Sequence, residues 1–377
     1  AKEKWRMEPD DRRPVIINAL YAWGGFVSDM LLPASQASQM AGNNYTLKPI
    51  AGDVGLRPSV LLIMGESLNP SHMGVLGYGR DTTPQLAALL QKYGGGEGKI
   101  ISAGVSTRVS IPTFLNVLRE PGNQMALRAS PVNLFRIAKN RGFQTAFLSV
   151  QDMGGISSVV GKESIDDWVD ALDHPTGAVP DNALVERLSH SKIDWDKPFF
   201  MVLNTRSTHL PYRSDFPEQF AHFSRGKTDS IAAQHVNEYD DAMLWFDQKV
   251  SDAIKYVFSA SKRPVIVVLV SDHGEMVDDD GGRFGHNVLF PSVYVTPYIW
   301  MSSDPNISGL GDFASCPVNH YQLGKIIAAK LGGQVINSLE GGDSPEYWVN
   351  GTSIDGGNGT FKYRESDVAK LLLCGRH

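Results

Sequence analysis

Short, wholly apolar segments that alternate with helical segments constrain the fold of this chain most strongly. Residues 59–64 read Ser-Val-Leu-Leu-Ile-Met, and residues 199–204 and 265–271 have the same character. Short runs without polar alternation are typical of parallel strands that are buried on both faces. The helical patterns between them cover residues 83–93, 132–141, 231–261 and 318–331. This order predicts an α/β fold, a doubly wound and mostly parallel sheet with helices on both faces.

Other segments add detail to this prediction. Residues 143–150 and 292–301 are further strand candidates. Residues 94–98 (Gly-Gly-Gly-Glu-Gly) are interpreted as a flexible connection and not as a dinucleotide fingerprint, because no helix follows them directly. Thr83 and Pro84 are the expected N-cap and first residue of the helix that they begin. A helix is also expected over 110–118, with Ser110 as its N-cap and Pro112 in its first turn.

Composition excludes several classes of protein. Hydrophobic residues make up 42% of the 377 residues, which excludes intrinsic disorder. The formal net charge is −6 and no basic block is present, so a nucleic-acid partner is disfavoured. The sequence contains no run of about 18 uncharged apolar residues, so no membrane span is predicted within these residues. The two cysteines, Cys316 and Cys374, could form one bridge or remain buried thiols, and the absence of a spacing motif favours thiols.

Polar residues follow several predicted strands directly. Glu66 comes after residues 59–64, and Asp272 and His273 come after residues 265–271. Sites in open α/β sheets form beyond the carboxyl ends of the strands, so these side chains are expected to lie at one edge. A carboxylate beside an imidazole suits zinc or manganese better than calcium. The alternatives are a surface glutamate and a hydrogen-bonded Asp–His pair.

A turn rich in hydroxyl groups, residues 104–112, precedes the helix expected at 110–118 and contains Thr107. Backbone amides at the start of a helix can hold a phosphate group or favour an alkoxide. His209 follows the strand at 199–204, and His286 lies in the loop after Asp272 and His273. A single histidine is more often structural than catalytic. Several polar residues at strand ends on one edge instead favour a site.

Together these segments resemble the phosphoethanolamine transferases of the alkaline phosphatase/sulfatase superfamily. The matching segments occur in the family's order between residue 59 and about residue 300. They are Gly65-Glu66-Ser67, residues 77–84 (Gly-Tyr-Gly-Arg-Asp-Thr-Thr-Pro), residues 106–112 (Ser-Thr-Arg-Val-Ser-Ile-Pro), residues 208–212 (Thr-His-Leu-Pro-Tyr), residues 271–275 (Ser-Asp-His-Gly-Glu) and Gly285-His286.

The resemblance assigns roles to residues. Thr107 matches the family's nucleophile, which takes up the phosphoethanolamine group. One zinc ion is expected. His209 and His286 match histidines that hold the phosphate, bind a second zinc ion or handle the proton. The residues that match the zinc ligands are Glu66, Thr107, Asp272 and His273.

The implied reaction has two steps. Phosphatidylethanolamine gives its head group to Thr107 and leaves as diacylglycerol. A hydroxyl group of a glycan or lipid-linked glycan then displaces Thr107 from phosphorus. Zinc favours the alkoxide of a threonine, which is otherwise a poor nucleophile.

Two departures from the family leave the acceptor open. Relatives that act on lipid A commonly carry bridged cysteines near the nucleophile, but Thr113 follows Pro112 here. A periplasmic glucan or another glycan is therefore an alternative to lipid A. An Asn-rich turn found in some relatives is replaced by Gln-Asp-Met-Gly-Gly at 151–155, so ethanolamine recognition cannot be carried over.

Other functions compete with this interpretation. A phosphoglycerol transferase or a phosphodiesterase would keep Thr107 and the metal ligands on the same scaffold. A non-catalytic binding module would keep only the fold. A sulfatase is disfavoured because Phe114 stands where its formylglycine motif needs arginine, and no Gly-x-Ser-x-Gly elbow indicates a serine hydrolase.

The resemblance also predicts the organisation of the protein. Residues 1–57 are expected to form a membrane-proximal or linker segment, in which the apolar and aromatic stretch 14–33 either covers the main domain or lies at a membrane surface. Residues 58–335 are the expected sulfatase-like catalytic domain, and residues 336–377 a small C-terminal extension packed on it. The domain is expected to be monomeric and periplasmic, attached to the inner membrane through a membrane domain that precedes this sequence.

Overall fold

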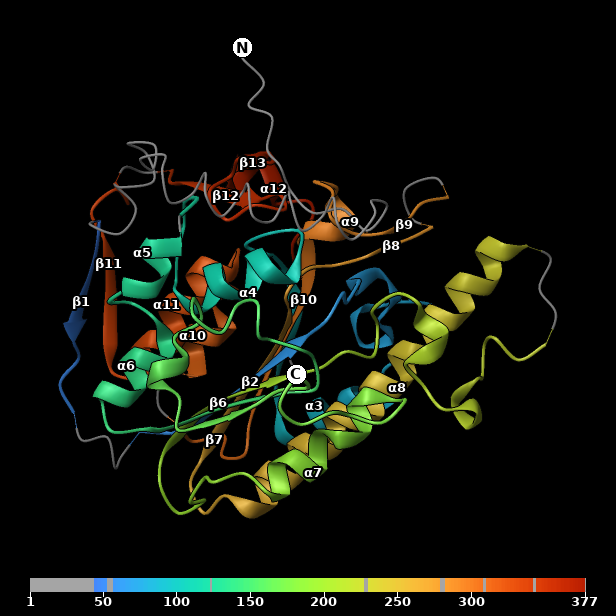
Figure 1. Ribbon diagram of the computed structural model, residues 1–377, viewed down its shortest axis with the longest axis horizontal. Coiled ribbons are helices and arrows are strands. Elements are labelled where there is room, and N and C mark those ends of the chain that lie inside the picture. Colours follow the sequence, from blue (N-terminus) through green and yellow to red (C-terminus); the bar gives the residue numbers. More distant parts are fainter. Residues whose placement is uncertain are drawn as a thin grey trace, which may run out of the picture.

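A mixed sheet forms the centre of the molecule (Figure 1). The computed structural model describes residues 44–52, 57–122, 124–226, 230–278, 282–307, 310–341 and 344–376. Within this part of the chain the sheet has eight strands, in the order β14-β3-β10-β7-β2-β6-β4-β5. Their bounds are β2 Ser59–Gly65, β3 Gly95–Ile101, β4 Gln144–Ser149, β5 Asp167–Val169, β6 Phe199–Asn204, β7 Val265–Ser271, β10 Val295–Ser302 and β14 Leu373–Arg376.

The predicted doubly wound and mostly parallel sheet is confirmed. The five neighbouring strands β5, β4, β6, β2 and β7 all run parallel. Strand β10 runs antiparallel to both of its neighbours, β7 and β3, and β14 runs antiparallel to β3. The carboxyl ends of β2 and β7 therefore meet side by side at one edge, with Gly65 opposite Ser271.

Helices cover both faces of this sheet (Figure 1). Alternate residues of β2 point to opposite faces, so Val60 and Leu62 enter one buried apolar cluster while Leu61 and Ile63 enter the other. Helices α4, α6 and α11 pack on the first face, and α3, α7 and α8 on the second. The helices are α3 Pro84–Tyr93, α4 Thr107–Leu115, α5 Gln124–Ala129, α6 Leu134–Asn140, α7 Ala183–Ser189, α8 Ile231–Ala260, α9 Pro291–Tyr294, α10 Leu310–Ala314, α11 His320–Lys330 and α12 Glu365–Val368.

Three two-stranded sheets accompany the central one. Strand β1 (Tyr45–Pro49) pairs with β11 (Gly333–Asn337), and the short β8 (Met276–Val277) pairs with β9 (Phe284–Gly285). Strands β12 (Glu346–Asn350) and β13 (Thr360–Arg364) form a hairpin in the C-terminal region. This region also contributes β14 to the central sheet. The domain boundaries 1–57, 58–335 and 336–377 remain a prediction.

The glycine-rich segment at 94–98 is not a loop, so that prediction is wrong. Residues 95–98 belong to β3 and pair with β10 on one side and β14 on the other. The backbone of β10 approaches so closely that a Cβ atom at Gly95 would lie 2.0 Å from the carbonyl oxygen of Trp300. Glycine is needed here for a close backbone contact, which the sequence pattern does not distinguish from a flexible turn.

The start of one helix, α4, differs from expectation, whereas α3 begins at Pro84 as expected. Helix α4 begins at Thr107 and not at Ser110, which places Pro112 beyond the first turn. Ser110 does not cap this helix, because its hydroxyl donates to the carbonyl oxygen of Asp272. Thr83 is the N-cap of α3 as expected, yet its side chain makes no capping hydrogen bond.

Strand β10 and the cysteines also require correction. The strand expected at 292–301 is preceded by the short helix α9, so β10 starts only at Val295. Cys316 is disulfide-bonded, which overturns the preference for thiols. Cys374 is the only other cysteine in the sequence.

The expectation for residues 14–33 lies outside the described residues. Among the residues that the structure describes, no helix combines the length and the apolar character needed to cross a membrane.

Candidate metal and transfer site

Four of the predicted site residues meet at the carboxyl edge of the sheet. Glu66 follows β2 directly, and Asp272 and His273 follow β7. Thr107 is the first residue of α4 and comes from the loop after β3. Glu66, Asp272 and His273 are at most 1% exposed. Because the preceding strands are buried, the fold holds these polar groups in an enclosed position.

The donor atoms of these residues lie close together. The hydroxyl oxygen (Oγ1) of Thr107 is 3.1 Å from Oε2 of Glu66 and 3.4 Å from Nε2 of His273. The same imidazole nitrogen is 3.6 Å from Oε1 of Glu66 and 3.4 Å from Oδ2 of Asp272. Ligand atoms of Glu66, Asp272 and His273 lie within 4.8 Å of one another and could hold a metal ion.

Asp272 and His273 present free acceptor atoms to this cluster. Oδ1 of Asp272 accepts hydrogen bonds from the backbone amides of Ser67 and His273, whereas its buried Oδ2 has no hydrogen-bond partner. Nδ1 of His273 lies 2.8 Å from the carbonyl oxygen of Gly274 and is therefore assigned the proton. Its Nε2 lone pair is then directed at Glu66 and Thr107. A buried acceptor without a donor calls for a cation.

Glu66 stays ionised despite its burial. Burial raises the pKa of Glu66, but the nearby imidazoles of His273, His209 and His286 and a hydrogen bond from Gln151 together lower it to about 2. Burial, followed by the charge of Glu66, raises the pKa of Asp272. The two carboxyl groups oppose each other's ionisation unless a cation lies between them.

Two further histidines flank the cluster. The ring of His286 lies 4.5 Å from that of His273 and 5.6 Å from that of His209. Nδ1 of His286 is 2.7 Å from Oε2 of Glu275, whose other oxygen accepts a hydrogen bond from Tyr212. Burial lowers the pKa of His286, but the hydrogen bond and charge of Glu275 outweigh it and raise the pKa overall. All six predicted site residues therefore lie together.

Three residues near the cluster were not predicted as site residues. Glu275 orients His286, and its only sequence signal is its place after Asp272 and His273. Nε2 of Gln151 donates to Oε2 of Glu66 over 2.9 Å, from the segment where the family pattern departs. Arg108, next to Thr107, is exposed, and a Cβ atom at Gly155 would lie 3.9 Å from its guanidinium carbon.

Curated relatives agree with the resemblance expected from the motifs. The chain is 26% identical over 323 residues to the Kdo(2)-lipid A phosphoethanolamine 7''-transferase of Escherichia coli K12, which covers 75% of this chain and 54% of the relative. It is 24% identical over 331 residues to the phosphoethanolamine transferase EptC of the same strain, covering 77% and 54%. The chain thus spans about half the length of these relatives.

Solved structures show the same fold. The periplasmic domain of EptC from Escherichia coli superposes with a TM-score of 0.66 at 20% identity, covering 84% of this chain and 97% of that one. This EptC domain has also been solved as a complex with zinc. The integral membrane protein EptA of Neisseria meningitidis gives a TM-score of 0.62 at 21% identity, covering 85% and 62%.

The family model for sulfatases matches residues 58–306, which is well over half of the chain. The match includes β2, α4 and β7, and with them all six predicted site residues. The chain belongs to the sulfatase family.

Proposed function

We propose that this protein transfers phosphoethanolamine from phosphatidylethanolamine to a hydroxyl group of a glycan or lipid-linked glycan, through a zinc site and a covalent intermediate on Thr107. The curated relatives support the type of reaction, since both are phosphoethanolamine transferases. We name the acceptor only by its chemical class, a glycan or lipid-linked glycan with a free hydroxyl group. Lipid A, named for one of these relatives, and other glycans both belong to that class.

The spacing of the four donor atoms carries this proposal. Zinc binds oxygen and nitrogen ligands at about 2.0–2.1 Å in tetrahedral sites, so neighbouring ligand atoms lie about 3.3–3.4 Å apart. The distances between Glu66, Thr107, His273 and Asp272 range from 3.1 to 3.6 Å. Two carboxylates, one imidazole and one hydroxyl are also a suitable donor set for zinc. The partnerless Oδ2 of Asp272 fits the same ion.

In this proposal Thr107 acts as the nucleophile. When bound, zinc would favour the alkoxide of its ligand threonine and neutralise charge on a phosphate oxygen. Thr107 is the first residue of α4, where free backbone amides and the helix dipole favour an anionic phosphate group. The side chain is only half-buried, so a substrate can reach it.

His286 lies next to the ligand residue His273, and His209 lies next to His286, so one of these imidazoles would serve the leaving group. In the first step Thr107 Oγ1 bonds to phosphorus, the bond to the diacylglycerol oxygen breaks, and that oxygen takes a proton from an imidazole. In the second step the same imidazole accepts the proton of the acceptor hydroxyl, whose oxygen displaces Thr107. Glu275 holds His286 in position for this exchange. In the alternative proposal, His273, Glu275 and His286 together hold a second zinc ion.

We also propose a periplasmic location with attachment to the inner membrane. The EptC structure is described as a periplasmic domain, and EptA as an integral membrane protein. The disulfide of Cys316 supports an oxidising compartment, because disulfides are rare in the bacterial cytosol.

Mass spectrometry of the intact protein tests this function. After incubation with phosphatidylethanolamine vesicles and zinc, we expect a phosphoethanolamine adduct on Thr107. The adduct should be absent after chelation by EDTA and in the Thr107→Ala variant, whereas Thr113→Ala, a buried threonine of the same helix, should retain it. Phosphatidylglycerol vesicles run in parallel identify a phosphoglycerol transferase if they alone give an adduct. Zinc-loaded protein without any adduct or turnover would instead favour a binding module.

A further inference from the structure

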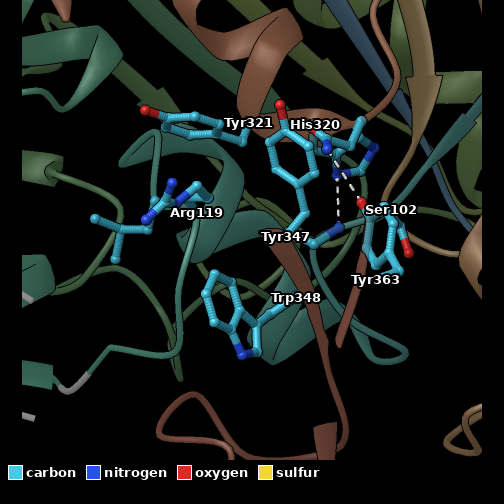
Figure 2. Close-up of a pocket in the computed structure, with 10 residues that line it drawn as sticks. Ser102, Arg119, His320, Tyr321, Tyr347, Trp348 and Tyr363 are labelled. Atoms are coloured by element: carbon cyan, nitrogen blue, oxygen red, sulfur yellow. Dashed lines mark hydrogen bonds between the residues drawn. The ribbon is translucent and has the colours of Figure 1, made fainter. Parts of the chain in front are cut away.

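Two cavities lie outside the transfer site, and they differ greatly in size. The first has a volume of about 10 Å³ and is lined by aromatic side chains, with Tyr347, Tyr363 and His320 gathered around it (Figure 2). This space accommodates no more than a water molecule. The second has a volume of about 310 Å³, which is within the range of small-molecule sites.

The larger cavity has a cationic lining. The lining residues include two lysines, Lys99 of β3 and Lys370 after α12, and two serines, Ser71 and Ser292. The remaining wall includes proline, valine and leucine side chains, and none of the lining residues is acidic. A lining with lysines and without acidic residues contrasts with the formal net charge of the whole chain, which is −6. The cavity, which we call the lysine cavity, therefore favours an anion.

Both lysines of the lysine cavity lack a partner among the described residues. Lys99 is half-buried in the sheet and Lys370 is exposed, yet neither forms an ion pair, a hydrogen bond or a contact with an aromatic ring. Of the other described lysines, only Lys48 is equally free. The rest contact an acidic group, an amide oxygen or an aromatic ring. Two of the three free lysines thus line one cavity.

The wall of the lysine cavity is bonded to the loop that carries the metal ligands. The side-chain amide of Asn69, a lining residue, donates to the carbonyl oxygen of Glu275 over 2.9 Å. The backbone amide of Gly274 also donates to the carbonyl oxygen of Val293, next to the lining residue Ser292. A Cβ atom at Gly274 would lie 2.2 Å from the carbonyl oxygen of Ser292. An occupant would therefore contact residues that pack against the Asp272–Glu275 loop.

We propose that the lysine cavity binds the phosphate group of a phosphorylated sugar. Two lysines bind a phosphate as point charges, and the hydroxyl groups of Ser71 and Ser292 suit a polar ring. The volume is too small for diacyl chains but sufficient for a sugar phosphate. This inference goes beyond the proposed function, because it assigns a second anion-binding site whose occupancy does not depend on the transfer reaction. The sugar phosphate is either a soluble molecule or the head group of a glycolipid.

Lysine acetylation followed by mass spectrometry tests the site directly. The zinc-loaded protein is acetylated with and without glucose 1-phosphate. We expect labelling of Lys99 and Lys370 to slow at least fivefold, while labelling of Lys48 stays unchanged. Glucose, the matched neutral ligand, should protect neither residue. Because labelling reports on each lysine separately, binding of phosphate at the metal site is not mistaken for binding in the cavity.

Vesicles distinguish the two sources of the ligand. Protection by phosphatidylcholine vesicles that contain lipid A, but not by glucose 1-phosphate, assigns the site to a glycolipid. Protection by glucose 1-phosphate assigns it to soluble sugar phosphates. In either case, binding is then measured with the probe that gave protection. A Lys99→Met/Lys370→Met double variant should bind this probe at least tenfold more weakly than the native protein, and Lys48→Met should bind it with unchanged affinity. Protection by neither probe, or equal protection of Lys48, overturns the proposal, whatever the outcome of the adduct experiment on Thr107.

Discussion

Gln151 shows how a single side chain outside the ligand set can control the metal site. Its amide group donates to Glu66 and also to the carbonyl oxygen of Thr205, so it fixes the Glu66 carboxylate relative to β6. Hydrogen bonds to ligand side chains commonly change metal affinity 10- to 100-fold. We therefore infer that Gln151 is a positioning residue for Glu66.

We expect Gln151→Ala to bind zinc at least tenfold more weakly than the native protein. Isothermal titration with Zn²⁺ measures this change. Gln144→Ala is the matched control, because Gln144 lies at the start of β4, the strand that precedes Gln151, and its amide group donates to the carbonyl oxygen of Asp194 at the surface. The thermal midpoint of the metal-free variant should stay within a few degrees of the native value. Unchanged zinc affinity would show that Gln151 does not position Glu66.

The burial of His320 is expected to make the stability of the protein sensitive to acid. Burial lowers the pKa of His320 to about 3, although a hydrogen bond with the backbone of Ser271 opposes this shift. In the unfolded chain its pKa is near 6.5, so below that pH the unfolded state binds a proton that the native state does not. The contribution of His320 is therefore complete above pH 6.5 and decreases by about 1.4 kcal/mol per pH unit as the pH falls towards 3.

His320→Gln should reduce this loss of stability. Urea denaturation measures the free energy of unfolding of the variant and of the native protein. We expect the difference between the two values to shrink as the pH falls from 7 to 4. His190→Gln, which replaces an exposed histidine, should change stability equally at both pH values. Parallel pH profiles for His320→Gln and the native protein would contradict the expectation.

Among the elements, α3 depends on a distant helix for its start. The carboxylate of Asp247, on α8, accepts hydrogen bonds from the backbone amides of Gln85 and Leu86, each over 2.8 Å. The Thr83 hydroxyl is occupied elsewhere, by the amide of Val75. This buried cap ties α3 to α8 on one face of the sheet.

Replacing that cap should destabilise the protein. We expect Asp247→Ala to lower the free energy of unfolding by about 1–3 kcal/mol, because one buried and one half-buried backbone amide lose their acceptor. Asp252→Ala, further along α8, removes only a contact with Gln248 and should cost at most about 0.5 kcal/mol. Urea denaturation measures both. Equal effects of the two substitutions would rule out the capping role.

Strand β3 offers a second test at the scale of elements. Gly95→Ala should destabilise the protein by several kcal/mol, since its Cβ atom would lie 2.0 Å from a backbone oxygen. Gly79→Ala meets nothing within 4 Å and should be tolerated. A thermal midpoint for Gly95→Ala close to that of Gly79→Ala would contradict the close contact with β10.

At the scale of the whole molecule, the disulfide of Cys316 links stability to redox conditions. Native disulfides typically contribute 2–4 kcal/mol. We expect dithiothreitol to lower the Tm of the native protein and to leave the Tm of Cys316→Ser unchanged. Loss of the same number of degrees from both proteins on reduction would show that another effect of the reductant is responsible.

The sequence predicted the parallel centre of the fold, and it predicted that the six candidate site residues lie together, for related reasons. Buried strands such as β2, β6 and β7 are apolar throughout, and the polar residues after them share one edge. Contacts between segments distant in the sequence were not predictable. The glycines of β3 were predicted to form a loop, because the close approach of β10 that requires glycine there cannot be seen in the sequence. The roles of Gln151 and Asp247 likewise depend on which elements pack together.

The position of β14 has a consequence for biogenesis. This strand, Leu373–Arg376, completes the β3 edge of the sheet, yet it is the last strand in the sequence, far after β3 at Gly95–Ile101. A polypeptide that is synthesised or exported N-terminus first displays β3 long before its final neighbour emerges. An uncovered strand edge can pair with other chains. We therefore expect truncation before Leu373 to increase aggregation of newly made protein, and protection by a chaperone to matter most during this interval.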